Sequence, residues 1–165
     1  FAGWGAAAAA AAAVALWVIP PAALPDYEAK LSGGTQELRG EIAESVETTQ
    51  PPPAFAPGDR FHVKVRPHTG LERAEELETR VVLIRGGEVR TVDAQAEVDS
   101  GGAARVTGSL APDLPAGDWV LWTVIGRRGE LPEPEQLQSA AASAPLRDRN
   151  WVAVPTALHV RPRAP

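Results

Sequence analysis

DWVLWTVI, residues 118–125, is the stretch that decides the fold, because apolar side chains stand at nearly every position. Such a run is typical of a β-strand that is covered on both faces, and we expect it to lie at the centre of a sheet. RVVLI, residues 80–84, has the same character. In FHVKVR, residues 61–66, apolar and polar residues alternate instead, which predicts a strand with one buried face.

Turn signals separate these runs from shorter β-patterned ones. Gly86-Gly87 predicts a hairpin after residues 80–84, and DSGG at 99–102 predicts another between residues 94–98 and 104–107. Residues 150–161 read as a last strand, broken or bulged at Pro155. About eight short strands at spacings of roughly 8–12 residues predict an antiparallel β-sandwich that occupies residues 27–165.

The corner LPAGDWVL, residues 114–121, resembles the start of a late strand in immunoglobulin-like and fibronectin-like domains, where an aromatic residue follows a tight turn. Trp119 stands where those domains often have a tyrosine. The chain has no cysteine pair, so the resemblance is to the broad architecture, over about residues 58–161. It implies a mainly β, immunoglobulin/fibronectin-like sandwich.

Residues 1–25, FAGWGAAAAAAAAVALWVIPPAALP, contain no charged residue. Alanine is the best helix former, and Pro20-Pro21 ends a helix. Residues 2–19 would span about 27 Å as a helix, enough for a thin hydrocarbon core. We therefore expect a transmembrane helix at residues 1–19 and a Pro-rich linker at 20–26. The residues that would hold the helix in the membrane are Trp4, Val14, Leu16, Trp17, Val18 and Ile19.

Two alternatives to a transmembrane helix stay open for this stretch. One is a signal-like segment, although residues 20–26 lack a convincing pair of small residues for cleavage. The other is an Ala-rich helix packed against protein. A water-exposed helix of this length normally carries charges on one face. The chain begins at Phe1 without methionine, so we also expect further residues to precede it.

Charge and composition exclude several function classes. The chain of 165 residues has a formal net charge of −5, which argues against nucleic acid as a partner because phosphate binding needs a concentrated basic face. The absence of cysteine excludes disulfides, thiol catalysis and cysteine-ligated zinc. No motif predicts a cofactor or a metal site. The glycine pairs lack the spacing of a phosphate-binding loop and read as turns.

The candidate catalytic residues do not form a recognisable motif. No serine lies in a G-x-S-x-G pattern, and His62 and His159 would meet only if their strands paired. The carboxylates at Glu72, Glu75, Glu76 and Glu78 lack the order of a calcium loop. The sequence therefore predicts a protein that is not an enzyme.

Three tryptophans lie in the predicted domain. Trp119 and Trp122 are three residues apart, so on one strand they face opposite sides of the sheet. One of them is expected in the core, and the other is either covered by the insert at residues 131–144 or exposed. We take Trp122 and Trp151 as the candidate contacts with a ligand or a protein partner.

A membrane helix, a short stalk and a β-domain together resemble the transmembrane and extracytoplasmic part of bacterial membrane-anchored anti-sigma factors. The resemblance lies in this organisation and in no sigma-binding residue. It implies an inner-membrane protein whose periplasmic or extracellular domain senses or regulates by binding a protein or small ligand. The alternative is a structural or adhesive subunit of an envelope complex. The sequence leaves the oligomeric state and the membrane orientation open.

Overall fold

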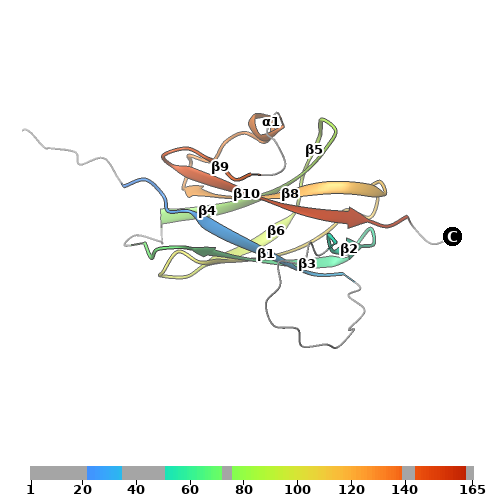
Figure 1. Ribbon diagram of the computed structural model, residues 1–165, viewed down its shortest axis with the longest axis horizontal. Helices are drawn as coiled ribbons and strands as arrows, with labels where there is room; N and C mark the ends of the chain where they lie inside the picture. Colours follow the sequence, from blue (N-terminus) through green and yellow to red (C-terminus); the bar gives the residue numbers. More distant parts are fainter. Residues whose placement is uncertain (1–21, 35–50, 72–75, 139–143, 163–165) are drawn as a thin grey trace, which may run out of the picture.

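The chain is mainly β, as the sequence predicted (Figure 1). The computed structural model describes residues 22–34, 51–71, 76–138 and 144–162. Within these residues there are ten strands and one short helix: β1 (Tyr27–Gly33), β2 (Ala54–Phe55), β3 (Arg60–Pro67), β4 (Leu77–Arg85), β5 (Glu88–Thr91), β6 (Ala94–Val98), β7 (Ala104–Ser109), β8 (Gly117–Arg127), α1 (Pro134–Leu137), β9 (Leu146–Arg147) and β10 (Trp151–Val160).

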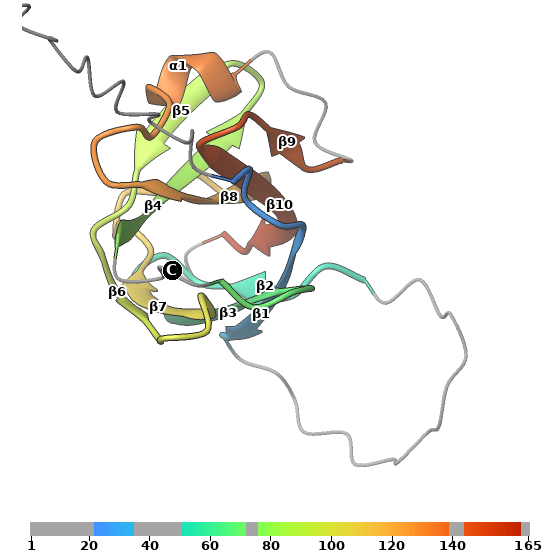
Figure 2. The ribbon, with the colours of Figure 1, turned by 90° about the vertical axis from the view of Figure 1, so that its left-hand side faces the viewer.

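The strands form two sheets. One has four strands in the order β1-β3-β7-β6, and all of its pairs are antiparallel. The other has six strands, in the order β2-β10-β8-β4-β5 with β9 on β10. Its long pairs, β10–β8 and β4–β8, are antiparallel, and only the two-residue strand β2 runs parallel to β10. Figure 2 shows the two sheets as separate layers, with α1 beyond the larger one.

The main core lies between the sheets. From the four-stranded sheet, Phe61, Val63 and Val65 are each 0 % exposed, and they belong to the same cluster as Leu121 and Ile125 of the six-stranded sheet. The residues between them on β3 are exposed. The alternation predicted for residues 61–66 is therefore confirmed.

Strand β8 lies between β10 and β4, so its predicted central position is confirmed. Its odd-numbered side chains, Trp119, Leu121 and Ile125, pack in the core between the sheets. Trp122 and Val124 face the opposite way, into a second buried cluster on the outer side of the six-stranded sheet. A strand with dry surfaces on both faces needs an apolar residue at nearly every position, which explains the sequence DWVLWTVI.

The second cluster is closed by the segment that connects β8 to β10. Leu137 of α1 is 1 % exposed and packs there, together with the half-buried Leu131 and Leu146. Helix α1 has a capping box, in which Glu133 and Gln136 satisfy each other's backbone N–H groups. Residues 131–138 of the insert predicted at residues 131–144 therefore cover part of one face of the sheet.

The expectation about the last strand needs correction. The last strand is not broken at Pro155, because β10 continues from Trp151 to Val160. On the side away from β8, β9 pairs with Val152 and Ala153 and β2 pairs with residues 159–160, so Pro155 lies where that edge has no described strand partner. A missing N–H costs little there. Strand β2 directly follows the three prolines at residues 51–53, where the sequence did not predict a strand.

The end of the predicted linker that the structure describes is packed against the domain. Leu24 is 1 % exposed and belongs to the main core. Arg147 donates from Nη1 to Asp26 Oδ1 at 2.6 Å and from Nη2 to the Leu24 carbonyl at 2.8 Å. Arg127 donates to the Ala22 carbonyl at 2.8 Å. Residues 22–26 are thus fixed to the domain and do not form a free spacer.

The predicted transmembrane helix at 1–19, with Trp4, Val14, Leu16, Trp17, Val18 and Ile19, lies outside the described residues. Within the described part of the chain, no helix has the length and apolar character needed to cross a bilayer.

Candidate functional site

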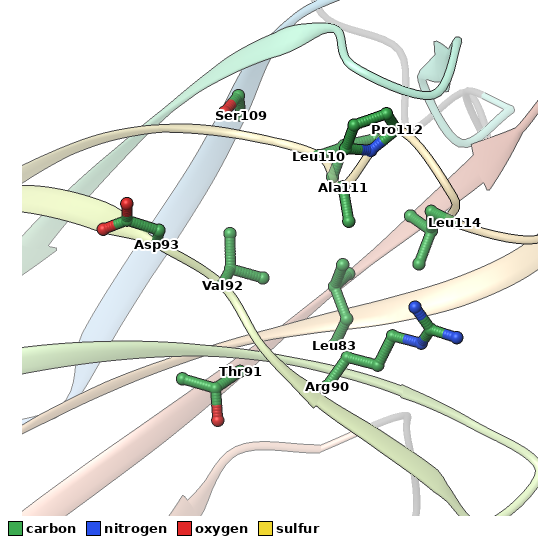
Figure 3. A pocket seen from close by; sticks show the side chains of 10 residues that line it. All are labelled: Leu83, Arg90, Thr91, Val92, Asp93, Ser109, Leu110, Ala111, Pro112 and Leu114. Atoms are coloured by element: carbon green, nitrogen blue, oxygen red, sulfur yellow. The ribbon is translucent and has the colours of Figure 1, made fainter.

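A cleft opens at one edge of the molecule, where the chain passes between the two sheets (Figure 3). It has a volume of about 540 Å³. This volume is within the range of small-molecule binding sites, about 300–1,000 Å³. Its walls come from strands β4 and β5, the β5–β6 connection, and the corner between β7 and β8, and the lining residues are Leu83, Arg90, Thr91, Val92, Asp93, Ser109, Leu110, Ala111, Pro112 and Leu114.

The cleft exists because β5 and β6 belong to different sheets. Only Val92 and Asp93 connect them, so the chain crosses from the six-stranded to the four-stranded sheet at this edge. Val92 donates its N–H to the Val81 carbonyl at 3.2 Å, which holds the crossing against β4. Opposite, Leu110 donates to the Asp59 carbonyl at 2.9 Å, and Leu114 closes a turn on Ala111 at 3.1 Å.

The floor of the cleft is apolar. Leu83, Leu110 and Leu114 are each at most 3 % exposed and belong to the main core. The half-buried Val92 and Ala111 lie above them, and in Figure 3 their side chains point into the space between the walls. An apolar group that entered here would displace water from a surface continuous with the core.

Arg90 supplies the charge at the rim. Its Nε donates to Glu88 Oε1 at 2.7 Å, and its Nη1 donates to Asp113 Oδ2 at 3.1 Å. These hydrogen bonds, first that to Glu88 and then that to Asp113, raise the pKa of Arg90. The bond from Arg90 in turn lowers the pKa of Asp113. The guanidinium therefore links β5 to the β7–β8 corner across the cleft and stays charged.

This arrangement fits binding of a molecule with an apolar body and a polar end. The leucines and Val92 form an apolar surface for the body, and the N–H groups of Arg90 that Glu88 and Asp113 do not engage can donate to a polar group at the rim. Sequence reasoning did not find this site, because its walls meet only through the crossing of the chain between sheets, and no local motif marks it.

The structure places the predicted contact residues elsewhere. Trp122 is 1 % exposed inside the second cluster, so the insert covers it, and a role as a contact residue stays a prediction. It reaches only the wall of another hollow, of about 400 Å³, beside Gly87 and Gln138. Trp122 is buried because β8 is covered on both faces. Trp151 is half-buried at the edge of the same cluster and keeps part of its surface exposed.

Trp119 is the tryptophan with a defined polar contact. It is 1 % exposed, and its Nε1 donates to the Pro115 carbonyl at 2.9 Å. The guanidinium of Arg85 lies over its ring, 4.5 Å from the centroid, in a cation–π contact. Trp119 therefore fixes the corner that carries one wall of the cleft.

The histidines do not come together. His62 lies on β3 of the four-stranded sheet, where it shares a hydrogen bond of 3.1 Å with Thr107. His159 lies on β10 of the other sheet, where its Nδ1 donates to Asp118 Oδ1 at 2.6 Å. Among the described residues, no three histidine or carboxylate side chains converge on a metal-sized site.

No protein-family model matches the chain, and no curated protein matches its sequence.

Proposed function

We propose that the two sheets form an immunoglobulin/fibronectin-like β-sandwich. The shared core between the sheets supports this assignment. So does the corner at Trp119, whose side chain bonds to the backbone four residues upstream, as the corner tyrosine does in such domains.

We further propose that the chain is a non-catalytic binding domain with a sensory or regulatory role, held at the bacterial inner membrane by residues 1–19 and facing the periplasm or the exterior. The cleft between the sheets is the single observation that carries the binding role. Its ligand would be an amphipathic molecule or the apolar side chain of a protein partner. We assign no cofactor, metal or nucleic acid to it.

The docked segment at residues 22–26 supports the regulatory role. A domain on a free linker would move independently of its anchor. Here Arg127 and Arg147 bind the segment that leads to the predicted helix. A change in the domain can therefore be passed to that helix, which is what a sensor requires.

The cleft is tested with 8-anilinonaphthalene-1-sulfonate, an apolar dye with one anionic group. We expect the dye to fluoresce when it binds the folded chain. Ala111→Trp, which fills the cleft, should lower the enhancement at least fivefold. Ala144→Trp, at an exposed position that does not line the cleft, serves as the control. Equal enhancement in the two variants would contradict the assignment of the cleft.

The anchor is tested by washing membranes that contain the full chain with alkaline carbonate. Retention in the pellet is expected for a spanning helix. Release into the supernatant would show that residues 1–19 do not span the membrane.

The second candidate, a structural or adhesive subunit, is favoured by one feature. β6 is an edge strand of the four-stranded sheet, and Gln95, Ala96 and Glu97 on it are all exposed. An exposed edge can pair with a strand of another subunit. Stable co-purification with envelope subunits, lost on Ala96→Pro without loss of the fold, would favour this candidate.

A further inference from the structure

The outer face of the four-stranded sheet carries a concentration of cations. Along β3 the exposed side chains are Arg60, His62, Lys64 and Arg66, and β1 and β7 add Lys30 and Arg105. Glu28 and Glu97 are the carboxylates that β1 and β6 contribute to the same face. The chain as a whole has a net charge of −5, so this face has the opposite sign to the protein.

Some of these cations lie directly opposite one another on neighbouring strands, and their repulsion lowers the stability of the folded chain. Lys30 lies directly opposite Lys64, and Lys64 lies directly opposite Arg105 on the next strand. Like charges at directly opposed positions repel each other. Lys30 and Lys64 are the two lysines of the chain, and neither makes an ion pair in the described structure. Glu97 lies directly opposite Arg105, whereas no carboxylate of the described sheet lies directly opposite Lys30 or Lys64, so the repulsion between the two lysines has no compensating partner across the strands.

The row of Lys30, Lys64 and Arg105 borders two hollows. One, of about 560 Å³, is lined by Ser32, His62, Lys64, Gln95, Glu97, Arg105 and Thr107. The other, of about 410 Å³, adds Arg66 and Asp99. Lys64, Arg105 and Glu97 line both hollows, so two cations and one carboxylate are common to them. Each hollow has room for a phosphate group, whose oxygens accept hydrogen bonds from ammonium and guanidinium groups.

We propose that this cationic face docks on the anionic phospholipid headgroups of the membrane that holds the chain. The inference rests on the proposed membrane anchor. Only Pro20 and Pro21 separate the predicted end of the span, Ile19, from Ala22, whose carbonyl is already bound by Arg127. The three chain steps from Ile19 to Ala22 reach about 10 Å, so an anchored domain lies close to the headgroups.

The shape of the face also favours a membrane over an acidic protein segment. The cations are spread over three adjacent strands, each about 4.8 Å from the next, and over about 20 Å of β3. Such a broad sheet surface matches a plane of many phosphates, each bound weakly. Neutralisation by several headgroups would relieve the repulsion among Lys30, Lys64 and Arg105.

The test uses the full chain in vesicles, with one cysteine introduced for labelling, since the native chain has none. A fluorophore on Gln95→Cys reports the cationic face, and one on Glu135→Cys, on exposed α1, reports the opposite face. The vesicles contain phosphatidylcholine alone or with 30 % phosphatidylglycerol, plus a nitroxide-headgroup lipid as quencher. We expect phosphatidylglycerol to increase quenching at position 95 only, and salt to reverse the increase.

Lys64→Glu is the decisive variant, and Arg161→Glu, which changes net charge equally at an exposed position after β10 and outside this face, is its control. Each cation near an anionic surface contributes about fivefold to partitioning, so Lys64→Glu should weaken docking at least fivefold and Arg161→Glu should not. Equal effects of the two variants, or equal quenching in both vesicle types, would overturn the proposal. Displacement by polyglutamate at a lower charge concentration than the lipid would overturn it in favour of an acidic protein.

Failure of the anchor and failure of the docking give different results. If carbonate releases the chain but phosphatidylglycerol still brings position 95 to the headgroups, only the anchor is wrong. If the chain is retained and position 95 shows no dependence on phosphatidylglycerol, only the docking is wrong.

Discussion

The outer face of the six-stranded sheet is buried beneath the segment that connects β8 to β10, whereas the outer face of the four-stranded sheet is exposed and cationic. We call them the covered face and the open face. Both sheets share the same inner core, so stability does not require the open face to be covered. The difference teaches that apolar residues bury the covered face, whereas charged residues keep the open face in solvent, where a partner can bind it.

The largest expected loss of stability comes from a substitution in the covered face. Trp122→Ala should lower the free energy of unfolding by about 3–5 kcal/mol, because it leaves a cavity among Val82, Ile84, Val124 and Leu137. Denaturant unfolding measures the change. His62→Ala on the open face is the matched control and should change stability by less than about 0.5 kcal/mol. Similar losses in the two variants would refute the distinction between the faces.

The second prediction tests whether water is excluded from the inner side of the four-stranded sheet. Tyr27, at the start of β1, is 4 % exposed, its hydroxyl has no hydrogen-bond partner, and burial raises its pKa to about 12. The unfolded chain releases this proton near pH 10, so the folded state holds more protons between pH 10 and 12, and its stability must fall over that window. We expect a loss of about 2 kcal/mol by pH 12.

Tyr27 is the single tyrosine, so its phenolate absorbance follows the titration directly. Tyr27→Phe should remove this alkaline loss and leave neutral-pH stability within about 0.5 kcal/mol. A midpoint near pH 10 in the folded chain would show that water reaches the inner side of the open sheet.

A smaller effect is expected at Thr123, on the inner side of β8. Its side chain is 0 % exposed and its hydroxyl has no partner. Thr123→Val keeps the shape and removes the unsatisfied hydroxyl, so it should raise the free energy of unfolding by about 1 kcal/mol. Thr107→Val on the open face, where the hydroxyl bonds to His62, should give no gain. A destabilised Thr123→Val would reveal a hydrogen bond from buried water.

The smallest effect concerns the cationic row on the open face. Lys64→Gln removes the central charge between Lys30 and Arg105, so it should raise the free energy of unfolding by roughly 0.2–1 kcal/mol at low salt. The gain should vanish in 1 M salt, where such charges are screened. A loss of stability at low salt would mean that Lys64 makes favourable contacts, and the row would no longer indicate a binding surface.

Local pattern was enough to predict the parts of the fold that depend on side-chain periodicity. The alternation at Phe61, Val63 and Val65 and the continuous run at residues 118–125 gave the buried faces correctly. The turns at Gly86-Gly87 and 99–102 gave the hairpins β4–β5 and β6–β7. These features could be predicted from the sequence because each depends on neighbours within a few residues.

Features that depend on residues distant in the sequence could not be predicted. Nothing in DWVLWTVI itself shows that Leu137, fifteen residues later, covers Trp122. Likewise, no neighbour of Pro155 in the sequence shows that β10 continues through it, because its unpaired edge is decided by where β2 and β9 end. The cleft and the row of Lys30, Lys64 and Arg105 both arise from strand order, which brings together residues from separate strands.

The two lysines provide the most direct test of the open face as the binding surface. The full native chain is placed in neutral or phosphatidylglycerol-containing vesicles, treated briefly with an amine-acetylating reagent, and the modification of Lys30 and Lys64 is measured by mass spectrometry. We predict at least fivefold slower acetylation of both lysines in the anionic vesicles at low salt, and recovery at high salt. Equal acetylation rates in the two kinds of vesicle would contradict the account.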